Sequence, residues 1–319
     1  MRSSISNSDA GAEAAVHPRT ERRVSGRLIF GTITLGLVAL GAIEAATRIG
    51  FSRISAIESR TAFEHAEALS IRHESAHTSV LLLGNSLLLE DVDMSALRKS
   101  LPSRLRVTRF TIESTHFLDW EYGLRRLFAD GSRPDLVMLL LGPTHVIATD
   151  IRGDYSAFYL FNTSDIMTLS SELHLSRTQI SSLYLARYSL FWAGRNNLRN
   201  FVLGRAMPAY AGFLHGLAIG GPKPVPDNVA TELSRQRLAA ARETARAYGA
   251  KFVFAIPPGF FASAEQAVIA GANEAGVTVL DPVPNGAWPA TLFRDGFHLN
   301  RQGAALFTPK LGAALATLN

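Results

Sequence analysis

The chain contains no cysteine among its 319 residues. Disulfide bonds and metal sites built on thiolates are therefore excluded, and the absence suits an oxidising compartment without establishing one. Charged residues are also scarce, at 18% of the sequence, which is low for a purely soluble domain and indicates a membrane segment. The hydrophobic share of 47% is sufficient for a sizeable core.

Two further patterns are missing. No glycine-rich phosphate-binding pattern follows any predicted strand, and no internal repeat is visible. The net charge is +5, but the basic residues are scattered and form no long run. Nucleic-acid binding depends on clustered basic residues, so we expect no nucleic-acid partner. No motif in the sequence indicates a cofactor, and we expect none.

One long apolar run lies near the N-terminus, at residues 28–43, and arginines precede it. With its flanks it covers residues 27–47, enough for a membrane span, which takes about 20 helical residues. Arginines before a span predict a cytoplasmic N-terminus, so everything after residue 50 would lie outside. Residues 1–26 are predicted to be a disordered cytoplasmic tail.

Two other interpretations of the apolar run stay open. Small residues at its end suit cleavage by a signal peptidase, and an apolar helix can also be buried in a soluble core. The run is longer than the usual apolar core of a signal peptide, which favours an uncleaved anchor.

Residues 48–77 are predicted to form a helical stalk that lifts the following domain off the membrane. Within it, His73-Glu74-Ser75-Ala76-His77 matches the His-Glu-x-x-His pattern, in which two histidines one helical turn apart bind zinc and the glutamate activates water. That site needs a continuing helix, whereas a buried strand begins soon after His77. We therefore favour a solvated helix end and expect no metal.

A serine stands directly after the first predicted strand. The apolar run Val80–Leu83 lacks alternation, which is typical of a strand buried on both faces, and Gly84-Asn85-Ser86 follows it. Open α/β sheets place ligands at the carboxyl ends of their strands, so Ser86 occupies a position suited to a nucleophile. The same residues would also serve as a plain turn.

The rest of the chain alternates between strand and helix patterns. Strands are predicted at 106–112, 136–141, 251–256 and 277–280, and helices at 93–100, 118–129, 228–248 and 301–318. This predicts an α/β domain at 78–319 with a five-stranded parallel sheet between two helix layers. An aromatic-rich insertion at 150–227 is predicted to interrupt it, and three roles for its rings stay open: they stack on sugars, form a core of their own or touch the bilayer.

Near the other end, Asp295 and His298 precede the last predicted helix. Serine needs a base to take its proton, and histidine serves best when a carboxylate orients it. An Asp-x-x-His alone is common in capping turns. Together with Gly84-Asn85-Ser86, it resembles the SGNH (GDSL-like) hydrolase superfamily, which has Gly-x-Ser after strand one and Asp-x-x-His before the final helix.

The resemblance covers residues 78–319 and implies a three-layer, flavodoxin-like fold. It assigns Ser86 as nucleophile, His298 as general base and Asp295 as the acid that orients the base. Two family blocks depart from the pattern, because Thr144 replaces an expected asparagine and Glu113-Ser114-Thr115 lacks an expected glycine. A backbone N–H of Ser114 or Thr115 can still serve as one donor, and a side chain of Thr144 or His145 as the other. The implied oxyanion hole is therefore assigned to Ser86, Ser114 and Thr144, and the implied substrate contacts are Asn85, Thr115 and His145.

For function, the resemblance implies a serine esterase or O-acyltransferase anchored in the inner (cytoplasmic) membrane with its domain in the periplasm. The implied substrates are acyl esters, specifically acetyl esters, of cell-envelope polysaccharide, and a membrane-bound O-acyltransferase is an implied partner. The altered oxyanion blocks keep an alternative open, in which the domain is a catalytically weak SGNH-like scaffold that docks that acyltransferase.

Overall fold

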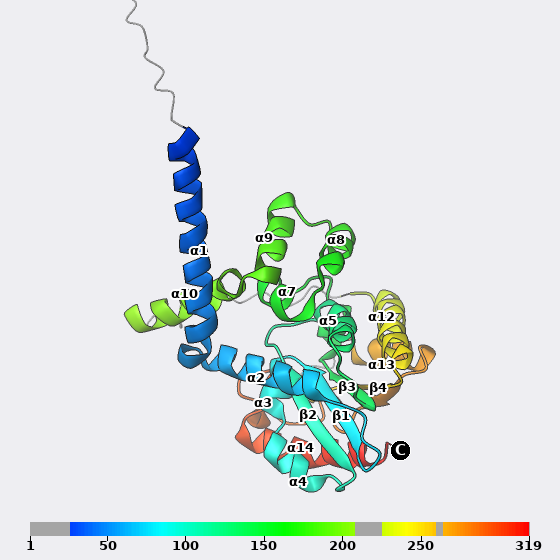
Figure 1. Cartoon of the computed structure of the whole chain (residues 1–319). Coiled ribbons are helices and arrows are strands. Elements are labelled where there is room, and N and C mark those ends of the chain that lie inside the picture. Colours follow the sequence, from blue (N-terminus) through cyan, green and yellow to red (C-terminus); the bar gives the residue numbers. More distant parts are fainter. Residues whose placement is uncertain (1–25, 208–224, 260–263, 319) are drawn as a thin grey trace, which may run out of the picture. The chain divides into compact units, whose positions relative to one another are not determined.

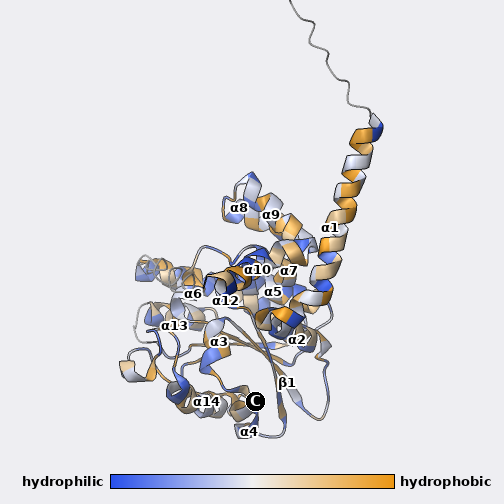
Figure 2. Cartoon of the chain, turned by 90° about the vertical axis from the view of Figure 1, so that its left-hand side faces the viewer, coloured by the Kyte–Doolittle hydropathy of each residue, from blue (hydrophilic) through white to orange (hydrophobic). Residues whose placement is uncertain are grey.

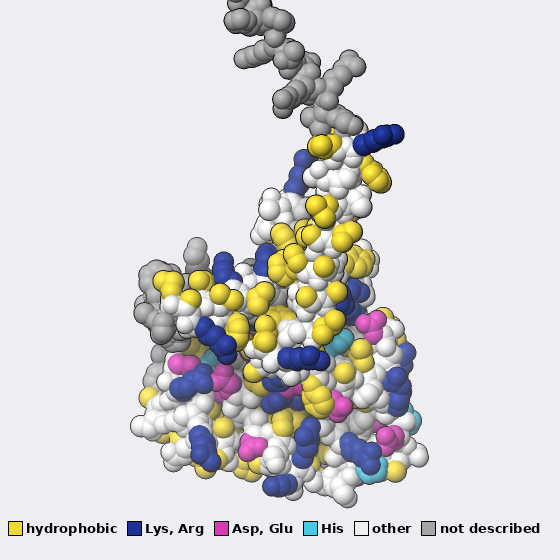
Figure 3. All heavy atoms as spheres, turned by 60° about the vertical axis from the view of Figure 1, so that its left-hand side comes forward, with side chains coloured by type: hydrophobic (Ala, Val, Ile, Leu, Met, Phe, Trp, Pro, Cys, Tyr) yellow, Lys and Arg dark blue, Asp and Glu magenta, His cyan; other side chains and the backbone are white. Residues whose placement is uncertain are grey.

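The computed structural model describes residues 26–207, 225–259 and 264–318, which divide into one unit ending at Ile43 and a second beginning at Glu44. Helix α1 (Gly26–Ile54) starts in the first unit and ends in the second. It is mostly hydrophobic along its length (Figure 2), and apolar side chains cover its surface (Figure 3). Among the described residues it is the one helix long and apolar enough to cross a membrane. The tail predicted at residues 1–26 lies outside the described residues except for Gly26.

Five parallel strands form the centre of the second unit (Figure 1). They are β1 (Thr78–Gly84), β2 (Leu105–Thr111), β3 (Leu136–Leu140), β4 (Lys251–Ala255) and β5 (Thr278–Leu280). The order β2-β1-β3-β4-β5 is that of flavodoxin-like sheets, and it reverses direction between β1 and β3. The predicted α/β fold class is therefore confirmed.

Helices cover both faces of the sheet because the strands are apolar on both sides. Leu81 and Leu83 of β1 pack into one core with the helices α5 (Phe117–Ala129), α12 (Asp227–Ala247) and α13 (Glu265–Glu274). Val80 and Leu82 point to the opposite core, which is closed by α3 (Ser86–Asp91), α4 (Met94–Ser100) and α14 (Arg301–Ala316). The uninterrupted apolar run of β1 follows from this double burial.

Helix α2 (Ala56–Ser70) packs against the edge strand β2. The buried carboxylate of Glu64 accepts hydrogen bonds from the backbone N–H and the hydroxyl of Thr111, at 2.8 and 2.7 Å. Arg60 donates to the Thr111 carbonyl at 3.1 Å, and Arg109 pairs with Glu64 at 2.7 Å. Side chains of α2 thus satisfy the strand edge near Thr111.

This packing corrects the stalk predicted at residues 48–77. Its first part is the end of α1, and its second part, α2, belongs to the domain. Residues 71–77 form no helix, and an isolated bridge joins Glu74 to His77. His73 instead pairs with Asp135. The two histidines of the His-Glu-x-x-His pattern therefore do not stand one helical turn apart. This segment lacks the helical arrangement that the zinc interpretation requires.

Up to residue 207 the insertion after β3 is helical, and residues 208–224 of the predicted segment lie outside the described residues. It follows the short helix α6 (Pro143–Ile147) and comprises α7 (Asp154–Leu160), α8 (Thr163–Glu172), α9 (Arg177–Tyr188) and α10 (Leu190–Ala206). Tyr155 and Tyr159 are buried, and their hydroxyls both donate to the buried carboxylate of Glu58 on α2, at 2.7 and 2.5 Å. These two tyrosines belong to the buried core and attach the insertion to α2, so their rings are not free to stack on a sugar.

Close packing at the end of β1 yields a prediction for Gly84→Ala. A methyl group there would lie 2.6 Å from the Leu140 carbonyl oxygen and 2.9 Å from Leu88 Cβ. We expect a loss of about 1–3 kcal/mol in the free energy of unfolding, because the contact is with backbone. Thermal unfolding of the full chain in detergent measures it. Gly204→Ala, where nothing lies within 4 Å, is the matched control, and equal melting temperatures for the two variants would contradict the prediction.

Candidate active site

The turn from β1 into α3 is fixed by Asn85. Its side-chain oxygen accepts from the Leu87 N–H at 3.0 Å, and its amide donates to the Thr115 carbonyl at 3.1 Å. Ser86 is the first residue of α3 and is half-buried. The serine hydroxyl therefore stands at the carboxyl end of β1, next to the point where the strand order reverses.

His298 lies against this serine although 212 residues separate them in sequence. Its Nε2 is 2.9 Å from Ser86 Oγ, and its Nδ1 is 2.9 Å from Asp295 Oδ2. The carboxylate of Asp295 also accepts from the Phe297 and His298 backbone N–H groups, at 3.1 and 2.9 Å. The three side chains thus form one hydrogen-bonded series from hydroxyl to carboxylate.

The electrostatics of Asp295 suit this arrangement. Partial burial raises the pKa of its carboxyl, but hydrogen bonds from the backbone and ring of His298, from the Phe297 N–H and from Arg294 outweigh burial and hold that pKa well below its usual value. The ionised carboxylate favours a proton on Nδ1 of the ring. Nε2 is then left to accept the hydroxyl proton of Ser86.

Helix α3 also holds the loop that carries the histidine. The buried carboxylate of Asp91 accepts the Leu299 N–H at 2.8 Å, and Glu90 forms an ion pair with Arg294. Burial raises the pKa of Asp91 well above its usual value. Sequence reasoning missed Asp91, because it ends the apolar Ser-Leu-Leu-Leu-Glu-Asp segment and shows no motif of its own.

The loop after β2 does not fit all of its predicted roles. Thr115 is fully buried, and its hydroxyl donates to the Ile112 carbonyl at 2.7 Å while accepting from the Trp120 indole at 2.9 Å. Asn85 is equally buried and engaged. Asn85 and Thr115 are thus engaged in structural hydrogen bonds with each other and with their neighbours, which sequence could not show, and their substrate contacts stay a prediction. Ser114 is exposed, with a positive φ of 59°.

The loop after β3 brings a pair of histidines together. Thr144 and His145 lie on α6, and both are half-buried. The rings of His145 and His116 are 5.4 Å apart between centroids. Burial, and secondarily the nearby His116 and His298, lower the pKa of His145 to about 4, so its ring is neutral at neutral pH. His116 in turn lies 2.7 Å from the Asp150 carboxylate.

A serine at the end of a central strand, hydrogen-bonded to a histidine that a carboxylate orients, defines the geometry of a nucleophilic serine site on a flavodoxin-like sheet. No protein-family model matches the chain. No curated protein matches it significantly. Among solved structures, one that it is similar to is described as "Crystal Structure of TesA", with 14% identity over 76% of this chain and 99% of that chain and a TM-score of 0.38. A likeness at that score carries no argument about function.

Replacing Asp91 by asparagine tests the buried carboxyl. The amide keeps an oxygen for the Leu299 N–H but does not titrate. Because the pKa of Asp91 is raised in the folded protein, the unfolded chain releases this proton first, and wild type loses stability as pH rises above about 4. We therefore expect Asp91→Asn to become more stable relative to wild type as pH increases.

Urea unfolding of both proteins at about pH 5 and about pH 8 measures this difference in the free energy of unfolding. The exposed Asp93→Asn serves as control, because its carboxylate caps α4 from the surface. A stability difference for Asp91→Asn that stays constant with pH would contradict the prediction.

Proposed function

We propose that the protein is an SGNH-type serine hydrolase or acyltransferase. The observation that carries this proposal is the 2.9 Å contact between His298 Nε2 and Ser86 Oγ, with Asp295 on the other ring nitrogen. His298 takes the proton of Ser86 as the serine oxygen attacks an acyl carbonyl, and Asp295 stabilises the imidazolium that forms.

The remaining steps reuse the same groups. The imidazolium of His298 returns its proton to the leaving alcohol, and the acyl group stays on Ser86 as an ester. His298 then removes a proton from water, which gives an esterase, or from a second hydroxyl, which gives an acyltransferase. Attack on the serine ester releases the acyl group and restores the Ser86 hydroxyl.

In this proposal the developing oxyanion is bound by Ser86, Ser114 and Thr144. Ser114 is exposed and Thr144 half-buried, so both are accessible, unlike Thr115. Losing one oxyanion donor typically costs about 10²–10³ in turnover, so these replacements for the family's glycine and asparagine set the rate that the site can reach. His145 contributes a neutral ring beside them.

Attachment and substrate belong to the same proposal. Helix α1 would anchor the chain in the inner (cytoplasmic) membrane, and the arginines before it would keep the N-terminus cytoplasmic and the domain periplasmic. The resemblance supports acetyl esters of cell-envelope polysaccharide as substrates and a membrane-bound O-acyltransferase as partner. The second candidate, a catalytically weak scaffold for that acyltransferase, is favoured by the altered oxyanion blocks.

A serine-directed fluorophosphonate probe separates the two candidates. We expect it to label the wild-type chain, and the same chain to hydrolyse p-nitrophenyl acetate, because His298 activates Ser86. Ser86→Ala should lose both, while Ser95→Ala, an exposed serine on α4, should keep both. Absence of labelling in the wild type would favour the scaffold.

Asp295→Asn tests the orienting carboxylate. The amide can present N–H to the ring and so favours the wrong tautomer, and we expect kcat for p-nitrophenyl acetate to fall by about 10³–10⁴. The matched control is Asp93→Asn, which makes the same change at an exposed carboxylate that caps α4 and has no role in the proposed reaction. If Asp295→Asn turned over at the wild-type rate, Asp295 would have no part in the chemistry.

A further inference from the structure

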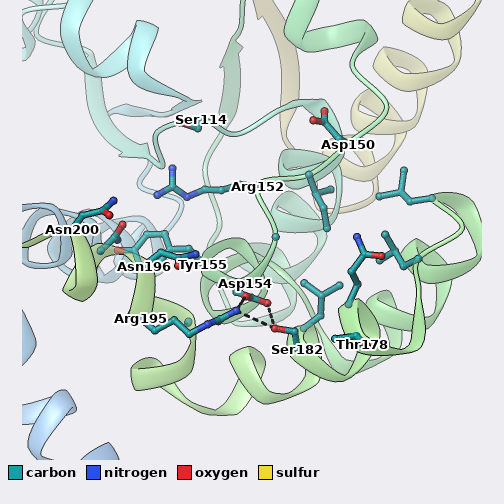
Figure 4. Close-up of a pocket in the computed structure, with 18 of the residues that line it drawn as sticks. Ser114, Asp150, Arg152, Asp154, Tyr155, Thr178, Ser182, Arg195, Asn196 and Asn200 are labelled. Atoms are coloured by element: carbon teal, nitrogen blue, oxygen red, sulfur yellow. Dashed lines mark hydrogen bonds and ion pairs between the residues drawn. The ribbon is translucent and has the colours of Figure 1, made fainter. Parts of the chain in front are cut away.

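A cavity of about 860 Å³ lies between the loop after β2 and the helices α7, α9 and α10 of the insertion. This volume is within the range of small-molecule binding sites. Figure 4 shows Asn196 and Asn200 extending from α10 and Ser182 and Thr178 from α9, with Ser114 near the ends of the strands. The cavity is therefore built by the insertion but opens beside the loop that contains Ser114.

The charges that line the cavity compensate one another. Asp154 pairs with Arg195 at 2.5 Å. The guanidinium of Arg152 donates to the Glu113 carbonyl, and Asp150 lies 2.7 Å from the ring of His116. The formal charges of the lining aspartates and arginines are two negative and two positive. This balance offers no excess charge to hold an ionic ligand.

Three asparagine side chains of α10 line the cavity. Asn196, Asn197 and Asn200 line the cavity from one helix, and the Asn197 side-chain nitrogen is buried without a hydrogen-bond partner among the described residues. An amide carries donors and an acceptor together. The complementary ligand group is neutral and both donates and accepts hydrogen bonds. A sugar carries several such groups, its hydroxyls, along one chain.

The cavity adjoins the loop after β2, which contains the proposed oxyanion donor Ser114. Ser114 belongs to its lining, and the neighbouring Thr115 carbonyl accepts the amide of Asn85, the residue before Ser86. Tyr155 offers no open ring for stacking, because it is buried and Arg152 lies over it at 5.1 Å from the ring centre. Recognition at this place therefore depends on hydrogen bonds.

We propose that this cavity binds a neutral carbohydrate, which either carries the acyl ester or accepts the acyl group. This inference rests on the proposed function of Ser86 and adds to it a location and a charge class for the substrate. A sugar chain seated among the α10 amides lies beside the loop of Ser114, the residue that the proposed function places in the oxyanion hole.

Binding is tested on the full chain in detergent micelles, carrying Ser86→Ala so that no turnover occurs. Isothermal titration uses chitohexaose and maltohexaose as neutral probes and hexagalacturonate as the acidic probe. We expect saturable binding of a neutral hexasaccharide, weakened about tenfold when Asn197→Leu and Asn200→Ala are added. Asn273→Ala, an exposed asparagine on α13, should leave this binding unchanged.

The proposal is overturned if neither neutral probe binds, if the acidic probe binds more tightly, or if the α10 substitutions leave affinity unchanged. Failure of the proposed function is tested separately, by fluorophosphonate labelling of the wild-type chain, which retains Ser86. Labelling without sugar binding overturns the cavity inference alone. Sugar binding that depends on Asn197 and Asn200, without labelling, supports the cavity and removes the catalytic role.

Discussion

The hydrogen bond between the Leu299 N–H and the buried carboxyl of Asp91, 2.8 Å long, is the contact on which the geometry of the site depends. Asp91 ends the helix that Ser86 begins, and Leu299 is the neighbour of His298. A single short helix therefore sets both halves of the serine–histidine pair. Because the bond is buried, its geometry is protected from competition with water, and the ring stays over the hydroxyl.

The sheet supplies the second constraint. Ser86 follows β1 and Thr144 follows β3, the two neighbouring strands between which the order reverses. The carboxyl ends of parallel strands lie at the same edge of the sheet, so the loops that follow β1 and β3 lie close together without any additional contact to hold them. The loop after β2 is held differently, because Arg60 and Glu64 of α2 fix Thr111 close to the start of that loop. The helix that follows the apolar segment thus takes part in shaping the site.

Local patterns were enough to predict the sheet, whereas the pairing of Ser86 with His298 was predicted from the family resemblance that Gly84-Asn85-Ser86 and the Asp295 and His298 motif carry together. Buried strands have unbroken apolar runs, and Asp93 caps α4 as a capping aspartate should, with bonds of 2.8 and 3.1 Å to backbone N–H groups. The roles of Asn85, Thr115 and α2 could not be predicted. Each role depends on a partner far away in the chain. In the sequence alone, a polar residue that is buried against such a partner cannot be distinguished from a polar residue that faces solvent.

The covering of β2 has a consequence for how copies of the domain behave together. A sheet is open to extension wherever an outer strand presents a row of unpaired backbone groups. At one margin Glu64 already occupies the N–H of Thr111, and at the other margin β5 has only the three residues Thr278–Leu280. The margin at β5 is therefore short, and the margin at β2 is already occupied at its carboxyl end, which reduces the open backbone through which domains crowded on a surface could pair strand to strand.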